Sequence, residues 1–141
     1  MRENDLVQLL AVPDQRAHAI RELVGGVGAT ELRQARPSYE AMQALIDGLR
    51  DESPQVRWWC VQLIDHVPDD RALDALVPVL DDPVPRVRRN AAHALGCVPC
   101  KPTWNGRLGA PVMVKLAEMA ARDVNAKVRQ EARRSLACAI S

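Results

Sequence analysis

The residues with the clearest potential for chemistry are one histidine and three cysteines in the second half of the sequence. His93 and Cys97 are four residues apart, which places both on one face of a helix. Cys97 and Cys100 form a CxxC pair, a spacing that zinc accepts, and Cys138 is a candidate for a further ligand. The same residues also fit a reactive thiol pair, or small side chains that close a helix at Gly96. Because a CxxC without a second pair is a weak signal, we assign no metal and no cofactor.

Other constellations that would support catalysis do not stand out. No glycine-rich phosphate loop follows a strand-like segment, and no Ser or Cys nucleophile has an evident base. Paired carboxylates are not apparent beyond the acidic residues of a repeated motif. We therefore expect a protein that is not an enzyme.

That motif recurs three times with the same internal spacing. In each copy an Asp precedes an Arg by six residues, a Val stands directly before the Arg, and an aliphatic residue follows the Val by eight. The Asp and Arg pairs are Asp51 with Arg57, Asp82 with Arg88, and Asp123 with Arg129. Recurrence of one pattern at an interval of thirty to forty residues is typical of a repeat array.

Apolar spacing and helix breakers divide the array into paired helices. Apolar residues from Met42 to Leu49 recur at i, i+3, i+4 and i+7, the pattern of one buried helix face. Ser53 and Asn125 are candidate caps of second helices, whereas Pro78 should bend the helix over 70–80 without ending it. The segments from Gly25 to Pro37 and between Pro99 and Ala110 are predicted loops. We expect one domain over 1–141 with units at about 3–25, 38–67, 70–98 and 110–140.

The paired helices, the D-x5-R spacing and the Val-Arg opening of each second helix resemble HEAT repeats. The short period is similar to the HEAT-like repeats of phycobilin lyase subunits. This resemblance implies an all-α fold, a right-handed α-solenoid of about four helical pairs whose second helices line a concave face that binds another protein. It also implies that Arg57, Arg88 and Arg129 join the Asp residues in an internal ladder instead of binding phosphate.

Helical geometry then selects the side chains that are free to meet a partner. With the Val of each second helix directed into the core, the residues two, six and ten positions later point away from it. Trp58 is the leading anchor, because an exposed Trp offers a large apolar area; alternatively, it only covers an edge while Trp59 fills the gap between helices. The predicted partner-binding residues are Trp58, Gln62, His66, Arg89, His93 and Arg134.

The charge distribution leaves two classes of partner open. The formal net charge is +1, but residues 1–85 hold 8 Lys and Arg against 15 Asp and Glu, and residues 86–141 hold 11 against 3. This asymmetry can steer a charged protein partner or favour self-association. The alternative is nucleic-acid or phosphate binding by the basic half, as in the HEAT-like DNA glycosylases. Solvated charge also explains the surplus.

The sequence gives little sign of targeting to a membrane. No apolar run approaches eighteen residues, and the first residues do not have the pattern of a signal peptide. Four cysteines in a chain this rich in aliphatic residues do not require a disulfide framework. We expect a cytoplasmic protein with reduced thiols and no membrane partner.

Overall fold

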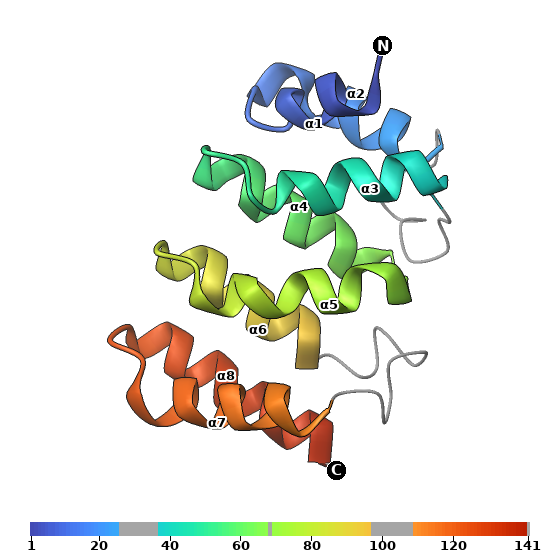
Figure 1. Ribbon diagram of the computed structural model, residues 1–141. Coiled ribbons are helices and arrows are strands. Elements are labelled where there is room, and N and C mark those ends of the chain that lie inside the picture. The colour runs from blue at the N-terminus through green and yellow to red at the C-terminus, as the bar shows by residue number, and fades with distance from the viewer. Residues whose placement is uncertain (26–36, 68, 97–108, 141) are drawn as a thin grey trace.

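The computed structural model describes residues 1–25, 37–67, 69–96 and 109–140, and within these ranges the chain is an all-α solenoid. Helical pairs are stacked one below the next from the N-terminus to the C-terminus (Figure 1). Helices α3, α5 and α7 form one layer, and α4, α6 and α8 lie behind them in this view. The α-helices are α1 (Glu3–Leu9), α2 (Pro13–Leu23), α3 (Tyr39–Gly48), α4 (Pro54–His66), α5 (Leu73–Leu76), α6 (Pro85–Gly96), α7 (Ala110–Arg122) and α8 (Ala126–Ile140).

Short polar side chains begin the helices where the sequence predicts them. The Ser53 hydroxyl accepts a hydrogen bond from the Val56 N–H at 3.4 Å, and Pro54 occupies the first turn of α4, where an N–H would lack a helical partner. The Asn125 side chain accepts from the N–H groups of Lys127 and Val128 at 2.9 and 3.1 Å. Both predicted N-caps are confirmed.

The segment around Pro78 differs from the predicted bent helix. Only Leu73–Leu76 is α-helical, and 3-10 turns flank it at Asp70–Ala72 and Val77–Asp81. Pro78 has no N–H to donate to the preceding turn and its ring crowds that turn, so the backbone tightens into a 3-10 helix. The apolar face nevertheless continues, because Leu76 and Leu80 are both buried.

The core consists of the inward stripes of successive second helices. Val56, Val87 and Val128, which occupy equivalent positions in α4, α6 and α8, are all 0% exposed. The residues one turn later are equally buried and small, namely Cys60, Ala91 and Ala132. The predicted core direction of these helices is therefore confirmed, and it fixes which side chains face outward.

An Arg–Asp ladder joins consecutive units at the turns that precede the second helices. Arg57 donates through Nε and Nη2 to Asp82 at 2.8 and 3.2 Å, and Arg88 donates in the same way to Asp123 at 2.9 and 3.0 Å. Arg57, Arg88 and Arg129 also each donate through Nη1 to the carbonyl of the Asp six residues before them. At the N-terminal end of the ladder, Asp51 accepts from Gln8 Nε2 of α1 at 2.7 Å. The Arg57 and Arg88 guanidinium groups are thus bound to carboxylates of the next unit, and that of Arg129 is bound to a backbone carbonyl.

Candidate partner-binding surface

The outward side of α4, α6 and α8, called the second-helix face below, is organised around His93 in α6. Its Nδ1 lies 3.1 Å from a carboxylate oxygen of Glu131 in α8, and its Nε2 lies 3.5 Å from a carboxylate oxygen of Asp65 in α4. The Asp65 side chain is 3% exposed, whereas that of His93 is 44% exposed. The imidazolium form can donate to both carboxylates, while the neutral ring can donate to only one. His93 therefore links three consecutive helical pairs and still presents a surface to solvent.

Asp65 and Glu131 were missed by the sequence analysis because they do not share a repeat position. Asp65 is nine residues after the Val of its helix, His93 is six after, and Glu131 is three after. The three side chains thus step back by about one helical turn per repeat, along a diagonal across the layer. A search for charged residues at intervals of one turn in successive units would have found them.

Two adjoining hollows flank His93, and both include Glu131 in their walls. The first has a volume of about 300 Å³ and is lined by Trp58, Arg86, Arg89, Asn90, His93 and Glu131. The second, of about 220 Å³, is lined by His93, Gly96, Glu131, Arg134, Ser135 and Cys138. The structure therefore brings four of the predicted partner-binding residues, Trp58, Arg89, His93 and Arg134, to one pair of hollows.

The other two predicted residues contact each other. Gln62 Nε2 and His66 Nε2 are 2.9 Å apart on α4, and both side chains are half-buried. Neither lines the hollows beside His93. Their place in a partner-binding surface stays a prediction, at its α4 edge.

Trp58 and Trp59 contact each other on α4. Their rings pack edge to face with centroids 4.9 Å apart, and the guanidinium of Arg16 stacks over Trp59 at 4.7 Å. Asn90 Nδ2 donates to the Trp58 carbonyl at 3.2 Å, which ties α6 to α4 beside the first hollow. Trp58 is half-buried against the core and also lines that hollow. Its ring therefore packs against other side chains and also forms part of the wall of the hollow.

Among the second helices, the exposed cations outside the ladder lie on α6 and α8. Arg86, Arg89, Lys127, Arg133 and Arg134 are exposed, and no carboxylate of the described residues forms an ion pair with them. The carboxylates of Asp65 and Glu131 already face His93. The accessible charge around the two hollows is consequently positive.

Of the candidate metal and thiol residues, the structure describes His93 and Cys138, and it also describes Cys60. Cys60 is fully buried, and burial, with a smaller contribution from the charge of Asp51, raises the pKa of its thiol far above the ordinary value, so Cys60 is inert as a nucleophile. In the ranges that the structure describes, no three His, Cys, Asp or Glu side chains gather as a metal site. Cys97 and Cys100 lie outside the described residues.

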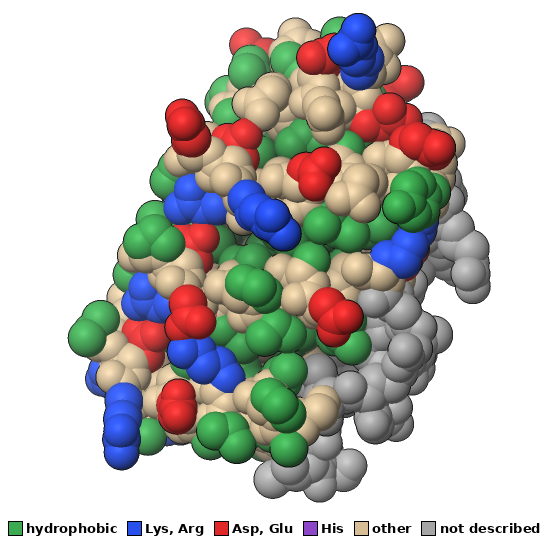
Figure 2. Space-filling view, in the orientation of Figure 1, with side chains coloured by type: hydrophobic (Ala, Val, Ile, Leu, Met, Phe, Trp, Pro, Cys, Tyr) green, Lys and Arg blue, Asp and Glu red, His purple; other side chains and the backbone are tan. Residues whose placement is uncertain are grey.

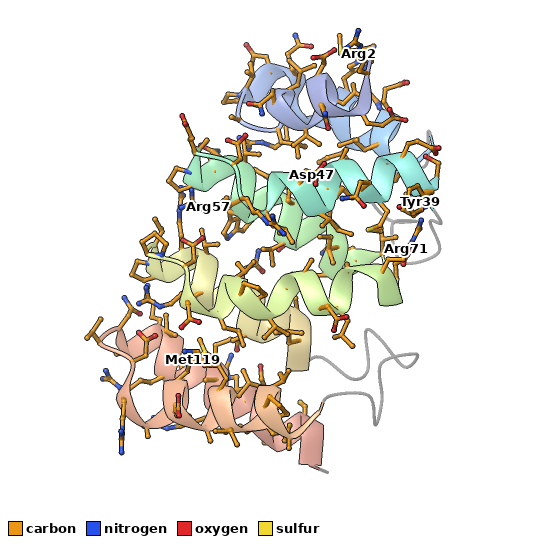
Figure 3. The ribbon with its side chains drawn as sticks, in the orientation of Figure 1. Arg2, Tyr39, Asp47, Arg57, Arg71 and Met119 are labelled. Carbon is orange, nitrogen blue, oxygen red and sulfur yellow. The ribbon has the colours of Figure 1, made fainter. Side chains whose placement is uncertain are left out.

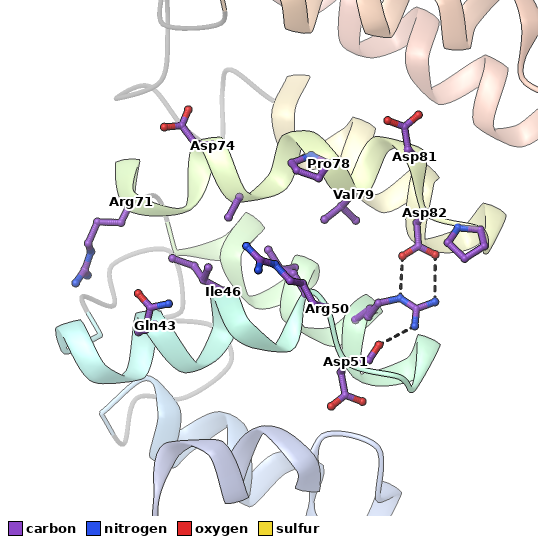
Figure 4. Close-up of a pocket in the computed structure, with 14 residues that line it drawn as sticks. Gln43, Ile46, Arg50, Asp51, Arg71, Asp74, Pro78, Val79, Asp81 and Asp82 are labelled. Atoms are coloured by element: carbon purple, nitrogen blue, oxygen red, sulfur yellow. Dashed lines mark hydrogen bonds and ion pairs between the residues drawn. The ribbon is translucent and has the colours of Figure 1, made fainter.

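A larger hollow lies in the opposite layer, between α3 and α5, with a volume of about 670 Å³. Ile46, Leu49 and Val79 are among the apolar residues that line it, and the Arg57–Asp82 ion pair lies at one end (Figure 4). Figure 2 shows Lys, Arg, Asp and Glu side chains intermixed over this layer, and Figure 3 shows Arg71 close to Tyr39 at its edge. Because both signs of charge surround it, this hollow favours no charged ligand.

The stacked helical pairs and the ladder agree with a match to a known protein family. A family model described as HEAT repeats matches residues 42–137, more than half of the chain. The chain belongs to the HEAT-repeat family. HEAT repeats generally mediate protein–protein interaction. No curated protein matches this HEAT-repeat chain, and the finer likeness to phycobilin lyase subunits stays a prediction. No helix in the described parts of the chain is both long and apolar enough to cross a membrane.

Proposed function

We propose that this HEAT-repeat chain is a non-catalytic binding module, a single domain of four helical units that holds a protein partner on the second-helix face. The observation that carries the proposal is the convergence of Trp58, Arg89, His93 and Arg134 on two adjoining hollows. Aromatic and Arg side chains are the commonest anchors of protein interfaces. Because His93 contacts carboxylates of both neighbouring helices, the surface is already ordered before a partner arrives.

The test compares two double variants that remove the same types of side chain from opposite layers. Trp58→Ala with Arg89→Ala removes an aromatic and a cation from the second-helix face. Tyr39→Ala with Arg50→Ala removes an exposed aromatic and an exposed cation from the α3 side. Capture of a partner from the native host should weaken at least tenfold with the first variant and stay unchanged with the second.

Thermal melting followed by circular dichroism shows whether either double variant has unfolded. Both double variants should remain helical at the temperature of the capture experiment. Equal capture by wild-type protein and the Trp58/Arg89 variant would contradict the proposed surface.

A second candidate function is nucleic-acid or phosphate binding, and it rests on the five exposed cations of α6 and α8. A site of this kind loses affinity steeply between low and moderate salt, because each neutralised phosphate releases counterions. Titration of a labelled DNA duplex at two salt concentrations tests it directly. Retention of the duplex, with a steep salt dependence that the Arg86→Ala and Arg89→Ala changes reduce, would favour this function over protein binding.

A further inference from the structure

We propose that the partner docks on the second-helix face through a short acidic segment, with carboxylates at Arg86 and Arg89 and one large apolar side chain against Trp58. This inference rests on the proposed protein-binding function and specifies the chemistry of its partner. It follows from three observations: the arginines of the first hollow that form no ion pair with described carboxylates, the volume of that hollow, and the short distance over which exposed cations are found.

The free charge of the first hollow comes from Arg86 and Arg89. Both are exposed, and neither forms an ion pair with any carboxylate of the described residues. The acidic member of the wall, Glu131, contacts His93 at 3.1 Å, and Arg88 between the two free arginines is held by Asp123. Guanidinium groups bind carboxylates with two parallel hydrogen bonds, so an acidic side chain is the complementary ligand.

The size of the hollow limits what enters it. Its volume of about 300 Å³ is at the lower limit of the range of small-molecule pockets, about 300–1,000 Å³. It is open, and the Trp58 ring provides its aromatic surface. One side chain of the size of Leu, Met or Phe fits this space, while an entire cofactor does not.

The exposed cations of the second-helix face are distributed over a short distance. Among the second helices, exposed cations lie on α6 and α8, whereas α4 contributes Arg57, which is bound in the ladder, and the buried carboxylate of Asp65. Neighbouring helices are about 8–10 Å apart, so a ligand that crosses from α6 to α8 travels roughly 10 Å along this face. An extended peptide covers that distance with about three residues. Nucleic-acid sites that bind through phosphates commonly use more contacts, about six to ten, so an acidic peptide is the better match.

The experiment selects a displayed library of random twelve-residue peptides on the immobilised full chain. We expect the bound peptides to be enriched in Asp and Glu and to share one large apolar residue. A synthetic peptide from that pool should bind at least tenfold more weakly to the Arg86→Ala/Arg89→Ala variant. Its affinity should be unchanged for Arg50→Ala/Arg122→Ala, which removes two exposed cations from the opposite layer. Trp58→Ala should abolish the preference for the apolar residue while the preference for acidic residues persists.

Each alternative result has a defined meaning. Enrichment of neutral or basic peptides would overturn the acidic-segment proposal, and the second-helix face would still stand as the interface if partner capture depends on Trp58 and Arg89. Displacement of the selected peptide by a twelve-nucleotide single-stranded DNA at equal concentration and moderate salt would overturn it in favour of nucleic acid. If no peptide is enriched on a correctly folded chain, the acidic-segment proposal is wrong. If, in addition, wild-type protein and the Trp58/Arg89 variant capture the partner equally, protein binding by the second-helix face is rejected as well.

Discussion

Two rows of ionisable side chains cross the same stack of helices, and they differ in exposure and in hydrogen-bond geometry. The Arg–Asp ladder runs along the turns before α4, α6 and α8, and its paired side chains are between 5% and 12% exposed. The Asp65–His93–Glu131 row crosses the same helices diagonally, with His93 44% exposed and its Nε2 3.5 Å from Asp65. Arg57 and Arg88 each donate two hydrogen bonds to one carboxylate, whereas each ring nitrogen of His93 lies near one carboxylate oxygen.

This contrast separates a row that holds repeats together from one that, in the proposed function, also contacts a partner. Ion pairs that are withdrawn from water and doubly hydrogen-bonded are costly to disrupt. A half-exposed His that spans two carboxylates contributes less, because water can replace part of what it donates. We therefore expect the ladder to dominate stability and the His93 row to dominate recognition.

Removal of a ladder guanidinium should produce the largest effect. Arg88→Ala leaves the Asp123 carboxylate, 9% exposed, without its cation and should lower the free energy of unfolding by about 3 kcal/mol. Urea denaturation followed by circular dichroism measures this loss. The matched control is Arg89→Ala on the same helix, for which a change within about 0.5 kcal/mol is expected. Equal losses in both variants would remove the distinction between ladder and free cations.

The close contact between α6 and α8 supports the Asp65–His93–Glu131 row. Its disruption should cause the next largest loss of stability. A methyl group on Gly96 would come 2.6 Å from the backbone Cα of Ser135, whose hydroxyl donates to the Ala92 carbonyl at 2.6 Å. Gly96→Ala should therefore force α8 away and destabilise the fold by about 2 kcal/mol. Gly109→Ala, whose new methyl group would meet only Pro111 at 3.5 Å, is the control and should cost less than about 1 kcal/mol.

Loss of the central His should have a smaller effect on stability than loss of a ladder Arg. We expect His93→Ala to cost about 1 kcal/mol, because the Asp65 carboxylate loses a hydrogen-bond donor that is already partly hydrated. The same variant should weaken partner capture more than His66→Ala does. A stability loss as large as that of Arg88→Ala would mean that the two rows are equivalent.

Low pH should lower the stability that the ladder contributes through Asp123. This effect should be smaller than those of the three substitutions above. Burial works to raise the pKa of Asp123, but hydrogen bonds from Arg88 and the Asn125 N–H and the charges of Arg88 and Arg129 outweigh it, so the pKa lies below its ordinary value. The unfolded chain therefore takes up the proton first as the pH falls, and the stability from this group is lost below about pH 4. Between pH 6 and pH 3, wild-type protein should lose more stability than Arg88→Ala, as urea denaturation at both pH values would show.

The sequence was sufficient for features that repeat at a fixed position. The Asp and Arg of the ladder, the buried Val of each second helix and the caps at Ser53 and Asn125 recur in register or obey local rules, and the structure confirms them. The family match over residues 42–137 agrees with the same pattern.

Features that depend on contacts between units could not be predicted in the same way. Asp65 and Glu131 occupy different positions of their repeats, so alignment of the units does not place them beside His93. The 3-10 geometry around Pro78 depends on how the ring meets the preceding turn, and apolar spacing does not report this. The half-burial of Trp58 follows from its contacts with Trp59 and the core, which are properties of the folded neighbourhood.

The position of Arg129 has a consequence for protein engineering. Within the described residues its guanidinium donates to the Asp123 carbonyl, and the side-chain acceptor that Arg57 and Arg88 find in the following unit has no counterpart. A duplicated module grafted behind α8, with an Asp at the turn before its second helix, would offer Arg129 a carboxylate in the orientation that the earlier modules use. The architecture is thus open to lengthening by whole modules, and the added Asp would set the register of each new joint.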